Sequence, residues 1–281
     1  MRISIVLLCY TILATSSGFS QTKTYPFEVL KTGKGSESMI FIPGFGCSGK
    51  VWEQTISNFE NDFSCYILTM AGFAGVPAQG SPTFNYWKTS IASYIKDNSI
   101  EKPILVGHSM GGVLAMEIAA DYPDLLERIV VVDGLPSLQA LSNPDFKASK
   151  NPSCSKIVNQ ITALSEEQFY QMQKANIPRM VTDTTKQKEI LSWTMACDRN
   201  VFAMMYCDFL NTDLRTKISN IKCPVLVMLS PGMENFKRNI DDQFKNLQTV
   251  ELQFAKKGLN FIMFDDPQWY LDQLTNFTSL N

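Results

Sequence analysis

Residues 103–112 read PILVGHSMGG, and this stretch decides the fold. Its apolar start predicts a buried strand, and the small and apolar residues after it predict a helix. The run that begins at Gly107 has the G-x-S-x-G form, in which a serine lies on a sharp turn between a strand and a helix. Gly107 and Gly111 leave room for the turn and for the close crossing of helix and strand. The pattern therefore makes Ser109 a candidate nucleophile, raised above the end of a strand.

Similar apolar runs recur along the chain on both sides of this stretch. The runs predicted as strands are 39–43, 65–70, 103–107, 128–133, 224–230 and 249–255. Near-continuous apolar runs are typical of strands that are covered on both faces of a parallel sheet. Amphipathic patterns predict helices between them, over 51–59, 86–94, 112–120, 236–247 and 267–277. Strands that alternate with helices predict an α/β fold with right-handed crossovers.

Residues 135–219 interrupt this alternation, because they contain no convincing strand and are too long for an ordinary loop. Apolar residues at helical spacing occupy positions 157–169, and a second helical pattern runs from 190 to 205. We expect a helical cap over the carboxyl ends of the strands, with 21–134 and 220–281 forming the core. Most Met and aromatic side chains of the cap are expected to pack internally, and a few to line an apolar pocket.

The amino terminus has the pattern of a targeting segment. Arg2 precedes a mostly apolar stretch over 3–14, which is too short to span a bilayer comfortably. Gly18 and Ser20 are small residues at −3 and −1 of a cut before Gln21. The sequence therefore predicts a signal peptide over 1–20 and a secreted or periplasmic protein, the alternative being a single membrane anchor.

The net charge and the motifs of the chain restrict the classes of partner, metal and cofactor that we expect. The net charge of −2 argues against nucleic acid or an anionic membrane surface as the main partner. The chain has no C-x-x-C motif and only one histidine, so a metal site is not expected. Phosphate-cradling patterns are also missing from the sequence, and no cofactor is implied.

Six cysteines remain once the signal peptide is removed, and they allow fifteen full pairings. Cys65 and Cys223 begin apolar runs and are interpreted as buried small residues. Cys154, Cys197 and Cys207 fall in one segment, where a disulfide is favoured.

Four segments, in this order, resemble the α/β-hydrolase superfamily, and in particular its small cap-bearing hydrolases and esterases. They are FIPGFG at 41–46, GHSMGG at 107–112, VVDG at 131–134 and NFIMFDDP at 260–267. The resemblance implies an α/β-hydrolase fold: a mostly parallel central sheet with flanking helices and a helical cap inserted before the late strands.

The family pattern also implies roles for individual residues. Ser109 is the expected nucleophile, and the backbone N–H groups of Phe45 and Met110 are the expected oxyanion hole. The expected acid is Asp133, at the end of the strand before the cap. Glu234 is the alternative, because Met233 takes the usual acid position after the next strand and Glu234 follows it. Without a catalytic role, Asp133 caps a turn and Glu234 is a helix N-terminal carboxylate.

The histidine base of the family is missing from its position. Relatives that resemble this chain read His-Phe-Ile-Met where this chain reads Asn260-Phe-Ile-Met. A carboxamide does not titrate near neutrality and cannot serve as a general base. His108 directly precedes the serine, where the family side chain is structural and points away from the hydroxyl. Lys256 and Lys257 lie close in sequence but are expected to be solvated.

Three hypotheses follow from this combination. The first is a hydrolase of carboxylic esters, lactones or amides, impaired at its base, with a small-molecule acyl substrate. The second is a non-catalytic protein that uses the same pocket to bind an apolar ligand. The third is another chemistry on the same serine, such as acyl transfer. None of them involves nucleic acid, or a membrane after signal cleavage.

Overall fold

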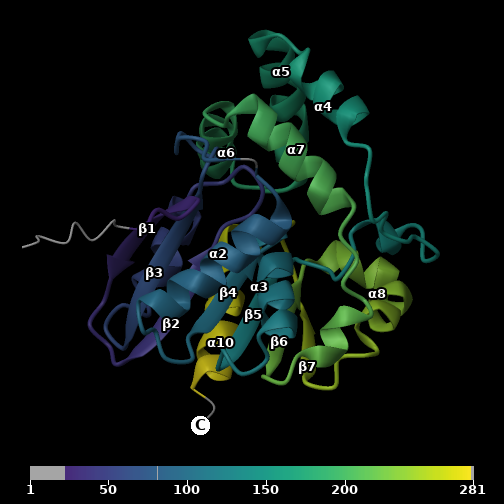
Figure 1. The fold of residues 1–281 in the computed structure, drawn as a ribbon. Coiled ribbons are helices and arrows are strands. Elements are labelled where there is room, and N and C mark those ends of the chain that lie inside the picture. Colours follow the sequence, from purple (N-terminus) through teal and green to yellow (C-terminus); the bar gives the residue numbers. More distant parts are fainter. Residues whose placement is uncertain (1–22, 81, 280–281) are drawn as a thin grey trace, which may run out of the picture.

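A seven-stranded sheet forms the centre of the computed structural model, which describes residues 23–80 and 82–279 (Figure 1). The strand order is β1-β3-β2-β4-β5-β6-β7. Their bounds are Phe27–Thr32 (β1), Glu37–Ile42 (β2), Phe63–Met70 (β3), Ile104–His108 (β4), Arg128–Val132 (β5), Val225–Leu229 (β6) and Val250–Phe254 (β7). All neighbouring strands are parallel except β1, which runs antiparallel to β3. The predicted α/β fold with a mostly parallel sheet is confirmed.

Helices cover both faces of the sheet. The bounds in the core are Glu53–Ile56 (α1), Phe84–Asp97 (α2), Met110–Asp121 (α3), Lys237–Phe244 (α8), Ile262–Asp265 (α9) and Pro267–Thr278 (α10). Short 3₁₀ turns occupy Gly49–Trp52, Gln139–Leu141, Ile177–Arg179, Lys217–Asn220 and Pro231–Phe236. Side chains of α2, α3 and α8 pack in one apolar cluster, and those of α1 and α10 pack in a second. Because successive residues of a strand point to opposite faces, Ile40 and Ile42 join the first cluster and Met39 and Phe41 join the second.

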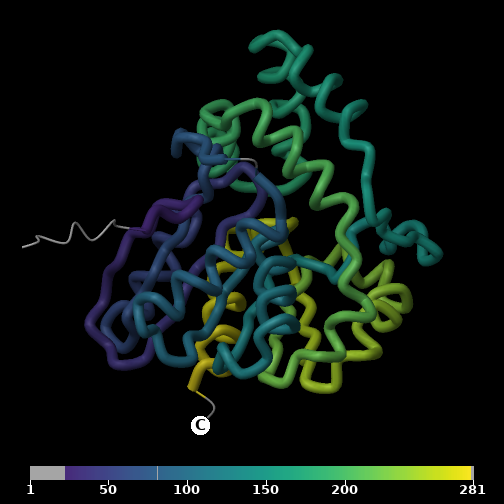
Figure 2. The backbone as a smooth tube through the Cα atoms, viewed as in Figure 1, coloured from purple at the N-terminus to yellow at the C-terminus, as the bar shows by residue number. Residues whose placement is uncertain are grey.

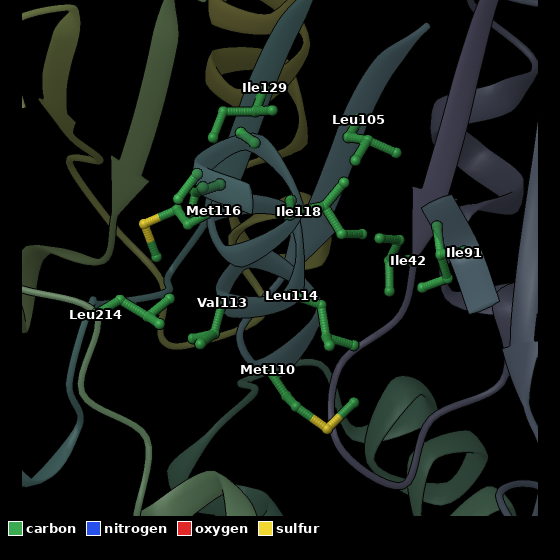
Figure 3. Packing of buried hydrophobic residues seen from close by; sticks show 14 of the residues in the cluster. Ile42, Ile91, Leu105, Met110, Val113, Leu114, Met116, Ile118, Ile129 and Leu214 are labelled. Carbon is green, nitrogen blue, oxygen red and sulfur yellow. The ribbon is translucent and has the colours of Figure 1, made fainter. Parts of the chain in front are cut away.

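The helix that follows the serine lies in the middle of the first cluster. Ten of the twelve residues of α3 are buried. Figure 3 shows its side chains beside those of the strands and of α2: Met110, Val113, Leu114, Met116 and Ile118 with Ile42, Leu105, Ile129 and Ile91. Burial on all sides fixes α3, and therefore the position of the residue before it.

Four helices lie between β5 and β6 in sequence: Ser155–Thr162 (α4), Glu166–Asn176 (α5), Thr184–Met195 (α6) and Arg199–Leu210 (α7). The tube in Figure 2 places them above the carboxyl ends of the strands. Backbone hydrogen bonds join the turn between α6 and α7 to the loop after β3, from Asp198 N to Gly72 O (2.8 Å) and from Gly75 N to Ala196 O (3.0 Å). We call α4–α7 the cap helices.

Several local predictions were wrong in detail. Strand β1 was not predicted, and the predicted helix over 51–59 is a 3₁₀ turn followed by the short α1. The helical pattern over 190–205 is divided between α6 and α7, because Asp198 caps the second helix by accepting a hydrogen bond from Val201 N. The predicted signal peptide lies outside the described residues. Within the part of the chain that the structure describes, no helix is long and apolar enough to cross a membrane.

Candidate active site

Ser109 lies on the turn between β4 and α3 with a backbone φ of 49° and ψ of −115°. L-residues rarely adopt this conformation, which stores strain of about 1–3 kcal/mol in many active sites. The turn needs glycine on either side: a Cβ on Gly107 would lie 2.2 Å from Gly111 O, and a Cβ on Gly111 would lie 2.3 Å from Ile42 O. The serine is half-buried, and its amide donates to Val132 O of the neighbouring strand at 2.7 Å. The structure thus has the sharp strand-to-helix turn that the sequence predicted.

The two expected oxyanion donors flank this turn. Phe45 follows β2, and Met110 is the first residue of α3. Among residues 23–80 and 82–279, neither backbone amide donates to a protein acceptor. The amide of Met110 also belongs to a helix N-terminus, where the partial positive charge favours an anion.

Asp133 directly follows β5 and is buried, with 6% of its surface exposed. Its carboxylate accepts two hydrogen bonds, from Ser230 N to Oδ1 (2.7 Å) and from Asn260 Nδ2 to Oδ2 (2.9 Å). Burial raises the pKa of Asp133, and these two donors oppose the rise because they stabilise the charged form. The backbone φ of 49° makes Asp133 a second strained residue at this edge of the sheet.

Asn260 lies on the loop between β7 and α9 and joins two other polar residues. Its Nδ2 donates to Asp133, and its Oδ1 lies 3.0 Å from Nε2 of His108. An asparagine Nδ2 is bonded to Cγ, as is Nδ1 of a histidine. The bond to Asp133 is therefore the one that an imidazole N–H would make at this position. The carboxamide reproduces that half of the ring and has no counterpart of Nε2.

His108 is buried, and its side chain contacts Asn260. Its Nε2 contacts both Oδ1 and the backbone O of Asn260, at 3.0 and 3.1 Å. The ring is 1% exposed and lies between the rings of Trp52 and Phe261. Burial lowers the pKa of His108 to about 4, so the imidazole is neutral at physiological pH. Sequence reasoning missed this contact, because no local pattern indicates which way the side chain before the serine turns.

The alternative acid is not part of this group. Glu234 lies exposed in the 3₁₀ turn Pro231–Phe236, and no hydrogen bond joins it to Asn260 or Ser109 within the described chain. Lys257 is solvated, as expected, with its ammonium 3.7 Å from Asp266. In the described parts of the chain, no group of three or more metal-ligating side chains occurs.

Aromatic side chains surround the loop that carries Phe45. The Phe45 ring lies 4.5 Å from that of Phe202, 5.6 Å from that of Tyr206 and 5.2 Å from that of Phe73, between ring centroids. Phe202 and Tyr206 belong to α7, so this cap helix contacts the loop that carries Phe45 through aromatic side chains.

Comparison with known proteins gives the family. The model of the α/β hydrolase fold family matches residues 37–256. A pimeloyl-acyl-carrier-protein methyl ester esterase from Aliivibrio salmonicida is 23% identical over 70% of this chain and 74% of its own length. The corresponding esterase of Vibrio cholerae is 23% identical over 69% and 75%.

Solved structures share the same architecture. The enol-lactonase from Burkholderia xenovorans has a TM-score of 0.74 at 14% identity, covering 90% of this chain and 96% of its own. An esterase from Thermogutta terrifontis has a TM-score of 0.73 at 14% identity, covering 90% and 92%. The chain therefore belongs to the α/β hydrolase fold family, and the curated relatives described here are esterases of that family.

Proposed function

We propose that the protein is a serine hydrolase of carboxylic esters, lactones or amides whose turnover is impaired at the general base. The single observation that carries the proposal is the hydrogen bond from Asn260 Nδ2 to Asp133. It supports the proposal because Asp133, the proposed acid, would otherwise orient an imidazole through this bond. Ser109, on its strained turn, completes the arrangement with the amides of Phe45 and Met110, which donate to no acceptor among the described residues.

The proposed reaction passes through an acyl-enzyme. The Ser109 oxygen attacks the carbonyl carbon, while the amides of Phe45 and Met110 stabilise the negative oxygen that develops. The C–O or C–N bond of the substrate then breaks, the alcohol or amine leaves, and water hydrolyses the acyl-serine. The serine proton must reach the leaving alcohol or amine in the first step, and a proton of the attacking water must return to the Ser109 oxygen in the last.

Asn260 cannot take either proton. Its oxygen accepts from His108, and one N–H donates to Asp133. The second N–H is therefore the group of the carboxamide that is left to face the serine or the substrate. That N–H is a donor, which is the opposite of what a base requires. Proton transfer then depends on solvent, and the oxyanion hole and binding alone leave about 10³–10⁴-fold catalysis over water.

The substrate class follows from the surroundings and from the relatives. Phe202 and Tyr206 favour an apolar acyl group beside Phe45. The matched relatives are named for a methyl ester and an enol-lactone. A small-molecule ester or lactone with an apolar acyl part is therefore the proposed substrate.

A fluorophosphonate probe tests whether Ser109 is a nucleophile. We expect slow labelling of the natural protein, none of Ser109→Ala, and much faster labelling of Asn260→His. Only the last variant has an imidazole at position 260 to take the serine proton. Peptide mapping should place the adduct on Ser109. Equal, negligible labelling of all three proteins would contradict the proposal.

A second candidate is a non-catalytic protein that binds an apolar ligand. It is favoured by Asn260, because both ends of its carboxamide have partners and the site is satisfied without a base. Calorimetry with non-hydrolysable esters would detect such binding. This candidate predicts affinity for the ligand together with no gain of hydrolysis in Asn260→His.

A further inference from the structure

We propose that His108 is a positioning residue, which fixes residue 260 beside Asp133 and braces the loop that carries the oxyanion donor Phe45. Its catalytic meaning rests on the proposed function, because it concerns the same site. No sequence pattern assigned this role, since the family resemblance implied only a structural side chain that points away from the Ser109 hydroxyl.

The first observation is that Nε2 of His108 has two acceptors within hydrogen-bond distance. Nε2 of His108 lies 3.1 Å from the backbone O of Asn260 and 3.0 Å from its Oδ1. Both partners are acceptors, so Nε2 must carry the proton and share it between them. The contact with the backbone holds the loop after β7 against the end of β4, whatever side chain residue 260 carries.

The second observation is the orientation of the carboxamide. Asp133 accepts from Nδ2, and the Nε2–H of His108 donates to Oδ1. Turning the carboxamide over would bring Oδ1 to the carboxylate and the NH₂ group to another N–H. His108 and Asp133 thus select one orientation, with the amide nitrogen on the side of the acid.

The third observation is the position of the other ring nitrogen. Nδ1 of His108 is buried and has no hydrogen-bond partner among the described residues. A Cβ added to Gly44 would lie 2.5 Å from it, so the ring is in close contact with the backbone directly before Phe45. The His108 ring therefore contacts both the loop of residue 260 and the loop that carries Phe45.

Burial among the groups that face the ring lowers its pKa and keeps it neutral, although the hydrogen bonds to Asn260 oppose this by raising the pKa. The facing groups are Asn260, Gly44, and the rings of Trp52 and Phe261. Asn260 links Asp133 to the ring by hydrogen bonds to both residues. A neutral ring with one donor can hold an acceptor in place without competing for the serine proton.

Nitrogen-15 NMR tests the geometry on the natural protein. His108 is the only histidine of the chain, so selective ¹⁵N-histidine labelling gives one imidazole. We expect a protonated Nε2, an unprotonated Nδ1, and no titration between pH 5.5 and 8.5. A protonated Nδ1, or a midpoint near 6.5, would overturn the proposal.

Variants test the consequence for catalysis in the Asn260→His background. Gln and His carry their Nε2 four bonds from Cα, so His108→Gln keeps a donor and His108→Leu removes it. We expect His108→Leu to lower kcat for an ester by about 10-fold or more, with a smaller effect on KM, since misplaced groups cost rate steeply. His108→Gln should recover most of the loss.

A matched control separates positioning from packing. Thr55→Val removes another buried hydrogen bond, from Thr55 Oγ1 to the Tyr270 hydroxyl (3.2 Å), which involves neither His108 nor residue 260. It should lower stability and leave kcat unchanged. If His108→Leu lowers only stability, as Thr55→Val does, the positioning role is wrong.

The two proposals fail in different ways. If Asn260→His gains no hydrolysis, the proposed function fails, and the NMR experiment still decides the position and tautomer of His108. If Asn260→His is active and His108→Leu leaves its kcat unchanged, only the positioning role fails.

Discussion

At the scale of single residues, the carboxamide of Asn260 resembles one part of an imidazole, because its Nδ2 is bonded to Cγ as Nδ1 of a histidine is. It keeps the N–H that Asp133 accepts and lacks the nitrogen that would face a serine. The buried carboxylate has two donors, Ser230 N and Asn260 Nδ2. Under the proposed function, the site would therefore lack a base without leaving Asp133 unsatisfied.

Removing the carboxamide should destabilise the fold. In Asn260→Ala, buried Asp133 loses one donor and His108 loses an acceptor, and we expect the free energy of unfolding to fall by about 1–3 kcal/mol. Urea denaturation measures this change. Asn85→Ala, at an exposed position on α2, is the control and should have little effect. Equal midpoints for all three proteins would show that the contacts contribute nothing.

His108 should make stability depend on pH. Its folded pKa, about 4, lies below the ordinary value of 6.5. A depressed pKa contributes stability that is present above pH 6.5 and is lost as pH falls toward 4. From pH 7.5 to 4.5 the free energy of unfolding should fall by about 2–3 kcal/mol more in the natural protein than in His108→Gln.

Comparing the two proteins at each pH isolates this effect. Carboxylates such as Asp121, whose pKa is lowered by Lys217 and Lys88 against the effect of burial, titrate in both and cancel. Parallel stability curves for the natural protein and His108→Gln would mean that His108 is not buried in a neutral form.

At the scale of elements, a disulfide joins the two ends of the cap helices. Cys154, directly before α4, is bonded to Cys207 on α7 across 53 residues of sequence. The sequence favoured a bridge in this segment and left the choice among three cysteines open. Cys197 is the one left free, with its thiol 3.5 Å from Gly46 O.

The bridge should stabilise the cap helices by restricting the unfolded chain. For a loop of this length, the chain-entropy relation gives about 4 kcal/mol. A thiol reductant should lower the guanidinium midpoint of the natural protein and leave that of the Cys154→Ser/Cys207→Ser protein unchanged. Equal midpoints for the natural protein with and without reductant would contradict a structural role for the bridge.

The central strands were predicted well because they are buried on both faces. Strands β4 and β5 read as continuous apolar runs, and the structure places them in the middle of the sheet. Strand β1 was missed because it lies at an edge and exposes much of its side chains, including 66% of Leu30. The break between α6 and α7 was missed because a capping aspartate interrupts an otherwise helical pattern.

At the scale of the whole molecule, sequence predicted a group of site residues, but not the contacts that hold each of them. The motif order implied that Ser109, Asp133 and residue 260 gather at one edge of the sheet, and the hydrogen bond from Asn260 to Asp133 brings two of them together. The contact of His108 with Asn260 joins residues 152 positions apart. No local pattern encodes such a contact, because the loop packing decides it.

We propose that the protein is exported, with residues 1–20 removed. Expression of the full chain in a bacterial host is expected to yield a periplasmic or secreted protein whose first residue is Gln21, since Gly18 and Ser20 form a small-residue cleavage site. Intact-mass analysis and amino-terminal sequencing measure this. A mature protein that retains Arg2 would contradict cleavage and favour the membrane anchor.

Steady-state hydrolysis of p-nitrophenyl esters by Asn260→His tests the central claim most directly. We predict that kcat rises by about 10³-fold or more over the natural protein, and that Ser109→Ala in the same background abolishes the gain. A folded Asn260→His protein with no more activity than the natural one would contradict a hydrolase site that lacks only its base.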